Sequence, residues 1–228
     1  AREPITPNLY KLPSEPVLLA LGDEAYGSTR LEQSLPRGAE GSPLLIVVPK
    51  DGKSGLSIEE VTAANSIAIG DALKHLKITT ILAVDLGGDS LTGGIDFEGG
   101  SFEFGRDRQV LHALSASRIP FVQMVFGPGC DGESTIDAMQ KAVKAADDAG
   151  SLLGVLPLHG LVPEMAEMAK TLKSSRTPNI LARAMARLEG SAPAEESCEY
   201  CVIERHGNRA EIPWSWLTVA LAIKHDSG

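Results

Sequence analysis

The chain has 228 residues, of which 43% are hydrophobic and 22% charged, a composition typical of a soluble globular protein. Its formal net charge of −9 argues against a surface that binds nucleic acid or an anionic membrane, although a bound cation can join acidic loops to a phosphate group. Three cysteines are too few for a disulfide framework, and no apolar run reaches the roughly 18 residues of a membrane span, so we expect a cytoplasmic protein.

The first part of the chain is expected to begin irregularly and then to alternate between strand and helix. Residues 1–43, rich in Pro and Gly, are predicted to lack regular structure, apart from an apolar run at 17–21 that fits either a short strand or a turn of helix. A strand is predicted at 44–48. The helix after it begins with a Ser-x-x-Glu capping box at 57–60 and runs to residue 76.

The rest of the chain continues this alternation. The predicted elements are, in chain order, strand 79–84, helix 106–117, strand 121–126, helix 133–149, an apolar run at 152–156 that fits strand or helix, helices 161–173 and 177–189, a loop at 190–197, an edge strand at 200–204 and a final apolar helix at 213–224. Strands separated by helices predict a parallel sheet that is covered on both faces. We therefore expect residues 1–228 to form a single three-layer, Rossmann-like α/β domain with a mainly parallel sheet, in which residues 190–228 supply a C-terminal edge strand and helix.

Polar side chains and glycines follow two of the predicted strands, at the point where each apolar run stops. The candidate ligand-binding residues there are Asp85, Gly87, Gly88, Asp89 and Ser90 after strand 79–84, and Gly127, Gly129 and Asp131 after strand 121–126. In open α/β sheets, ligands bind just beyond the carboxyl ends of strands. The carboxylates of Asp85, Asp89 and Asp131 suit a divalent cation such as Mg²⁺, and the glycines would let backbone N–H groups approach an anion. The alternative is a pair of tight glycine turns in which the Asp side chains merely accept hydrogen bonds from nearby N–H groups.

Further residues in the sequence suggest chemistry of their own. Lys53 and Asp107 are added to the candidate ligand-binding residues, although Val47 stands where a phosphate-binding P-loop needs a glycine, which excludes that motif. Cys130, at a predicted helix start, would be a nucleophile only beside a base such as histidine. The pair Cys198-x-x-Cys201 is half of a zinc site at most, and two ordinary thiols at a strand start are the favoured interpretation.

The segment Gly88-Asp-Ser-Leu91 spells the nucleophile block of the G-D-S-L esterases and so resembles that family. The family's serine is activated by an Asp-x-x-His pair, but none of the five histidines here has an aspartate three residues earlier. The family's Gly-x-Asn-Asp oxyanion block is also missing. An esterase that uses Ser90 is therefore the least favoured hypothesis.

The most specific motif of the chain is Val84-Asp-Leu-Gly-Gly-Asp-Ser90, which is accompanied by Tyr10, the strand at 44–48, Gly105-Arg-Asp107, Phe126-Gly-Pro-Gly-Cys-Asp131, Gly150-Ser-Leu-Leu-Gly154 and Arg176-Thr-Pro-Asn-Ile180. Over most of residues 44–220, these features resemble the archaeal and eukaryotic family of domains of unknown function numbered eleven fifty-two, in which the first motif typically reads Val-Asp-Gly-Gly-Thr-Asp-Ser. Leu86 departs from the glycine of that pattern. A first strand with a glycine-rich, acid-containing turn is also not found here, so a phosphate-binding element is expected to be lost or to precede this sequence. The resemblance implies a Rossmann-type α/β fold and carries no established activity.

The leading hypothesis for function is the binding of a small anionic ligand, phosphate-bearing or nucleotide-like, with Mg²⁺ or another divalent cation assisting. If the protein is an enzyme, paired carboxylates suit a metal-assisted hydrolase or phosphotransferase best. The main alternative is a non-catalytic regulatory or scaffold protein. Homodimerisation through the final helix, which carries Trp214 and Trp216, would fit either function.

Overall fold

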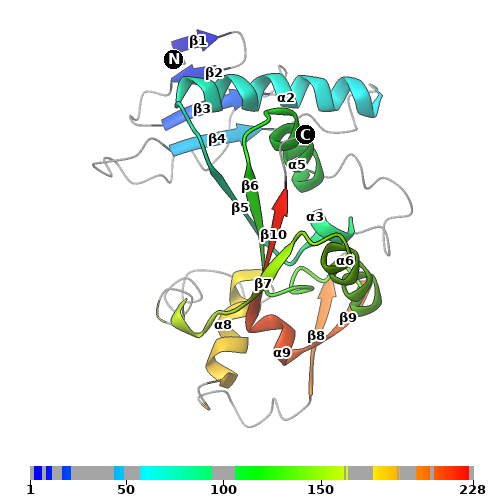
Figure 1. Ribbon diagram of the computed structural model, residues 1–228. Helices are drawn as coiled ribbons and strands as arrows, with labels where there is room; N and C mark the ends of the chain where they lie inside the picture. Colours follow the sequence, from blue (N-terminus) through cyan, green and yellow to red (C-terminus); the bar gives the residue numbers. More distant parts are fainter. Residues whose placement is uncertain are drawn as a thin grey trace. The chain divides into compact units, whose positions relative to one another are not determined.

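The computed structural model of the protein describes residues 3–6, 9–11, 17–21, 44–48, 57–93, 106–161, 163, 177–188, 190, 199–205 and 208–225 (Figure 1). The chain divides into two compact units. Unit 1 comprises Ala1–Thr80, Glu103–Pro120 and Ser227–Gly228, and unit 2 comprises Ile81–Phe102 and Phe121–Asp226. Each unit is described by itself, and a single domain over residues 1–228 stays a prediction.

Unit 1 contains a sheet with the strand order β1-β2-β3-β4. Its strands are β1 (Glu3–Thr6), β2 (Leu9–Lys11), β3 (Val17–Leu21) and β4 (Leu44–Val48). The β1–β2 and β2–β3 ladders are antiparallel, whereas β3 and β4 pair in parallel. The strand predicted at 44–48 is confirmed, and the apolar run at 17–21, for which strand and helix were both left open, is a strand. The irregular structure predicted for the rest of residues 1–43 is wrong at β1 and β2. Strands of three to five residues are too short to show a period, and what orders them is pairing with residues elsewhere in the chain.

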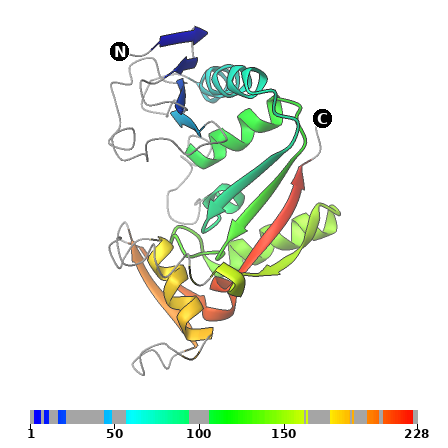
Figure 2. The same ribbon diagram turned by 90° about the vertical axis from the view of Figure 1, so that its left-hand side faces the viewer.

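Two helices of unit 1, α2 (Ile58–His75) and α5 (Arg106–Ala116), pack against one another (Figure 2). The predicted capping box at the start of α2 is confirmed: Glu60 N–H donates to Ser57 Oγ at 3.2 Å, and Ser57 N–H donates to Glu60 Oε2 at 2.8 Å. The contact between the helices contains a buried polar group, since Asn65 Nδ2 of α2 donates to Gln109 Oε1 of α5 at 3.1 Å. This bond satisfies two buried amides and fixes the register of the two helices.

Unit 2 is built on a sheet with the strand order β5-β6-β10-β7. Its strands are β5 (Ile81–Leu86), β6 (Phe121–Phe126), β7 (Leu152–Pro157) and β10 (Val219–His225). β5 and β6 pair in parallel, whereas β10 is antiparallel to both β6 and β7. The mixed α/β class is therefore confirmed. The mainly parallel sheet that the sequence predicts is not observed in these strands, because β10 lies between β6 and β7 and is antiparallel to both.

The final helix predicted at 213–224 is wrong. Only α9 (Trp214–Leu217) is helical, and β10 follows it as a strand inside the sheet, beside β6 in Figure 2. A strand with neighbours on both sides and cover on both faces reads as an unbroken apolar run, which short-range pattern cannot distinguish from a buried helix. Trp214 is 7% exposed and packs in a core cluster, and homodimerisation through this segment stays a prediction.

The remaining described elements of unit 2 are four helices or helical turns and a hairpin. They are α3 (Asp89–Thr92), α6 (Ile136–Asp148), the 3₁₀ helix η3 (His159–Leu161), α8 (Thr177–Leu188) and the antiparallel hairpin of β8 (Tyr200–Arg205) and β9 (Asn208–Pro213). One core cluster joins α8 to α9 and the hairpin, and includes Leu181, Cys201, Ile212 and Leu217. A second joins Met185 of α8 to Met124 of β6 and Ala222 of β10.

Several sequence predictions for this unit are settled by these bounds. The run at 152–156 is a strand, the helix predicted at 177–189 and the strand at 200–204 are confirmed, and the helix predicted at 161–173 lies largely outside the described residues. Among the helices of the described ranges, none combines the length and apolar character needed to cross a membrane.

Candidate functional site

Two loops meet at one edge of the unit 2 sheet: residues 87–88, which follow β5, and residues 127–135, which follow β6. The strands pair in parallel with Leu86 opposite Phe126, so the loops that follow them begin side by side at the carboxyl ends of the strands. Gly87 N–H donates to Phe126 O at 3.0 Å, and Gly129 N–H donates to Gly87 O at 2.6 Å. The structure thus brings together the two segments that the sequence analysis singled out.

The glycine at the centre of this contact has no substitute. Gly87 has a φ of +114°, which is a left-handed backbone conformation, and an added Cβ atom would overlap the carboxyl group of Asp131. Gly129 has a φ of +86°, and its Cβ atom would lie 2.7 Å from Ile212 Cδ1. These glycines therefore allow the two loops to pack closely, which is the role that the tight-turn alternative assigns to them.

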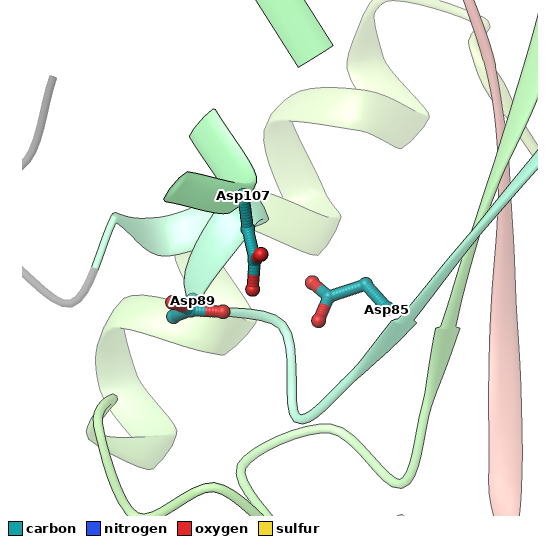
Figure 3. Close-up of side chains that lie close together, drawn as sticks. All are labelled: Asp85, Asp89 and Asp107. Atoms are coloured by element: carbon teal, nitrogen blue, oxygen red, sulfur yellow. The ribbon is translucent and has the colours of Figure 1, made fainter. Parts of the chain in front are cut away.

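Two carboxylates face each other beside the loops (Figure 3). Asp85 is the penultimate residue of β5 rather than a loop residue, and Asp89 is the first residue of α3. A carboxylate oxygen of Asp85 lies within 4.8 Å of one of Asp89, and both side chains are half-buried. Two acidic groups at this separation suit a shared divalent cation. The positive charge of the cation would offset the repulsion between the two carboxylates, whose oxygens would be its ligands.

A third acid, Asp131, lies against the same loop and is 5% exposed. Its Oδ2 accepts a hydrogen bond from Asp89 N–H at 3.2 Å, and its Oδ1 accepts one from Glu133 N–H at 3.0 Å. Burial raises the pKa of Asp131 from 3.8 to about 7; the Glu133 N–H lowers this pKa, the charges of Asp85 and Glu133 raise it, and the Asp89 N–H lowers it. Near neutral pH, Asp131 is therefore poised between a neutral and a charged form.

The backbone N–H groups of these loops are largely used inside the protein. Besides those of Gly87, Asp89 and Gly129, the N–H group of Ser90 donates to Asp89 Oδ1 at 3.0 Å, and that of Cys130 donates to Gly127 O at 2.9 Å. The loops consequently present carboxylates rather than a cradle of free donors. This arrangement favours direct binding of a cation to the carboxylates. An anion would then bind to that cation rather than to the loops.

Ser90 lies beneath the acids and is 2% exposed. Its Oγ donates to Asp85 Oδ2 and accepts from Gln123 Nε2 at 2.7 Å. His225 is separated from this hydroxyl by the Gln123 side chain, whose Oε1 lies 2.9 Å from His225 Nε2. An amide cannot relay a proton as a general base would, so this geometry does not favour an esterase with Ser90 as its nucleophile.

The other predicted residues fall in different places. Lys53 and Cys198 lie outside the described residues. Asp107, the third side chain labelled in Figure 3, is an exposed residue in the first turn of α5 and belongs to unit 1. Cys130 is fully buried with its Sγ 3.6 Å from Phe126 O, and Cys201 is part of the core, so neither thiol is placed as a surface nucleophile.

Sequence reasoning missed Gln123 and His225. Gln123 is 1% exposed and interrupts the apolar run of β6, and a polar residue inside such a run is a signal that could have been used. His225 carried no such signal, because it directly follows residues 213–224, which the apolar pattern assigned to a helix.

The comparisons with known proteins place the chain in a family without assigning an activity. No curated protein and no solved structure matches the chain. A family model described as "Protein of unknown function (DUF1152)" matches residues 36–200, which is well over half of the sequence. The chain therefore belongs to the DUF1152 family.

Proposed function

We propose that unit 2 binds a divalent cation, in the first place Mg²⁺, at Asp85 and Asp89, and through it a small phosphate-bearing or nucleotide-like ligand. The observation that carries this proposal is the approach of the two carboxylates to within 4.8 Å where β5 ends. Asp131 supports the site from below through the Asp89 N–H group. A cation there would supply a positive centre for phosphate oxygens, which the acidic loops cannot bind by themselves.

If the protein is an enzyme, metal-assisted hydrolysis or phosphoryl transfer is the class that this donor set supports. Asp131 has a raised pKa, about 7, and therefore belongs to the groups able to exchange a proton near neutral pH. Gly87, Gly88, Gly127 and Gly129 shape the floor of the site. Lys53 and Asp107, which belong to unit 1, stay candidates from the sequence alone.

A non-catalytic regulatory or scaffold protein is the second candidate. It is favoured by one observation: Asp89 and Asp131 each accept a backbone hydrogen bond close by, from Ser90 and Glu133 respectively, as they would in purely structural turns.

A Rossmann-like three-layer arrangement is part of what we propose for either function. It is supported by the parallel pairing of β5 with β6 in unit 2. Self-association and a cytoplasmic setting remain expectations.

The test is a titration of the full chain with Mg²⁺ and Mn²⁺ by isothermal calorimetry, followed by inorganic phosphate and a nucleotide panel with and without the cation. We expect saturable cation binding by the wild-type protein, its loss in Asp85→Asn and Asp89→Asn, and anion binding only when the cation is present. Asp147→Asn is the matched control, because it removes one exposed carboxylate of α6 and the same unit charge. Absence of cation binding in the wild type, or equal binding in all three variants, contradicts the proposal.

A further inference from the structure

One face of the unit 2 sheet carries a polar side chain on each of three neighbouring strands. Asp85 of β5 lies opposite Val125 of β6, and His225 of β10 lies opposite Phe121 of β6. Residues two apart along a strand share a face, so Gln123 is the diagonal neighbour of both Asp85 and His225. Three strands that are distant in sequence thus place an acid, an amide and an imidazole in one line.

Hydrogen bonds connect this line to the proposed cation site. His225 Nε2 lies 2.9 Å from Gln123 Oε1, Gln123 Nε2 donates to Ser90 Oγ at 2.7 Å, and Ser90 Oγ is bonded to Asp85 Oδ2. Gln123 and Ser90 are almost completely buried. The His225 ring is held by stacking on Phe121, with the ring centroids 4.4 Å apart and the planes within 4°.

The direction of each bond follows from the number of donors available. A carboxylate only accepts, so the single O–H of Ser90 is used on Asp85. Ser90 Oγ must then accept from Gln123, which turns the NH₂ group of that amide toward Ser90 and its carbonyl oxygen toward His225. The His225 nitrogen facing Gln123 is therefore Nε2–H. All three donors point toward Asp85, and bonds aligned in this way strengthen one another.

We propose that His225, Gln123 and Ser90 form a directed hydrogen-bond relay that positions Asp85 for the cation. They are positioning residues: they do not touch the ligand, but they fix the orientation of a carboxylate that does. This inference rests on the proposed cation site. Groups that orient metal ligands from behind typically change metal affinity by roughly 10- to 100-fold when they are removed.

The test is a double-mutant cycle in Mn²⁺ affinity on the full chain, with Ser90→Ala, Gln123→Met and the double variant. We expect each single variant to bind Mn²⁺ roughly 10- to 100-fold more weakly. The double variant should be no weaker than Ser90→Ala, because Gln123 acts on Asp85 only through the Ser90 hydroxyl. Ser134→Ala is the matched control: it removes a fully buried hydroxyl bonded to Thr92 at the same loops, and it should lower the melting temperature without changing Mn²⁺ affinity.

The outcomes separate the two proposals. A wild-type protein that binds no cation overturns the proposed function, and this inference with it. Wild-type binding that is unchanged in Ser90→Ala and Gln123→Met, or losses that simply add in the double variant, overturns the relay alone and leaves the cation site standing.

A second measurement needs no variant and no metal. The ¹⁵N chemical shifts of the His225 ring report which nitrogen carries the proton, and we expect the Nε2–H tautomer in the cation-free protein. The Nδ1–H tautomer would reverse the hydrogen bond to Gln123 and overturn the relay, whatever the variants show.

Discussion

At the scale of single residues, the most informative group is Asp131, a carboxyl group that is nearly excluded from water. Burial raises its pKa above that of an exposed aspartate, although two backbone N–H groups stabilise its charge. Hydrogen bonds to a carboxylate normally lower its pKa, so desolvation wins here. We expect this balance to make both stability and the proposed cation binding depend on pH near neutrality.

The first prediction concerns the pH dependence of stability. Between pH 3.8 and about 7, the unfolded chain has lost the Asp131 proton while the folded protein keeps it. The contribution of this group is therefore fully present below pH 3.8 and is lost as pH rises through about 7, with a slope of up to about 1.4 kcal/mol per pH unit. Urea unfolding of the wild type and Asp131→Asn from pH 4 to pH 8 measures it.

We expect the wild type to lose stability relative to Asp131→Asn as the pH rises, because the amide mimics the protonated acid and does not titrate. Parallel pH profiles of the two proteins would show that Asp131 ionises normally. A cation at Asp85 and Asp89 would favour the charged form of the neighbouring Asp131, so we expect weaker cation binding at pH 5 than at pH 8.

The second prediction concerns Gly87. Replacement by Ala meets two penalties, a left-handed backbone conformation and overlap with the Asp131 carboxyl group. We expect Gly87→Ala to lower the free energy of unfolding by about 2–5 kcal/mol. Gly150→Ala is the matched control, because Gly150 has a φ of +67° but no atom within 4 Å of the added Cβ, and we expect a loss of only about 1 kcal/mol. Equal losses in urea unfolding would contradict the close contact between Gly87 and Asp131.

At the scale of elements, the capping box of α2 is a feature that the sequence alone predicted and the structure confirms. We expect Ser57→Ala to destabilise the protein by about 1 kcal/mol, because the Glu60 N–H group loses its acceptor at the helix start. Ser57→Asp keeps an acceptor there and serves as the control, with little change expected. Urea unfolding followed by far-UV circular dichroism measures both variants, and equal stability of Ser57→Ala and the wild type would exclude the cap.

Elements whose signals are local were predicted well. The cap and the apolar stripe of α2 predict a helix, and the apolar run of β6, which ends at a glycine, predicts a strand. β10 was mistaken for a helix because its alternation is hidden: Ala220, Leu221, Ala222 and Ile223 are all buried, although they face opposite sides of the sheet. Only the pairing with β6 and β7 makes this segment a strand, and pairing across such distances cannot be read from a window of residues.

At the scale of the whole molecule, the site followed from sheet topology more than from any motif. Asp85, Asp89 and Asp131 were expected to meet because adjacent parallel strands release their loops at one edge, and they do. The Ser90–Gln123–His225 line could not be foreseen in the same way. It depends on β10 being the other neighbour of β6, and on a register that puts His225 opposite Phe121.

The fourth prediction uses the division into two units. Asp85 and Asp89 both belong to unit 2, so cation binding should stabilise that unit. We expect 10 mM Mg²⁺ to slow amide hydrogen exchange in β5, β6 and β10, with α2 of unit 1 as the internal reference. Mass spectrometry of peptides from the full chain measures this. Exchange that is unchanged in β5 and β6 under conditions where calorimetry detects binding would place the cation elsewhere.

The position of β10 separates the order of synthesis from the order of assembly. Of the four strands in its sheet it is made last, yet it lies between β6 and β7 and is the partner through which β7 joins the others. During synthesis, the edges of β6 and β7 that pair with β10 therefore stay unpaired until residues 219–225 emerge from the ribosome. A nascent chain at that stage can pair wrongly or aggregate. A chaperone that shields these edges would act within this interval.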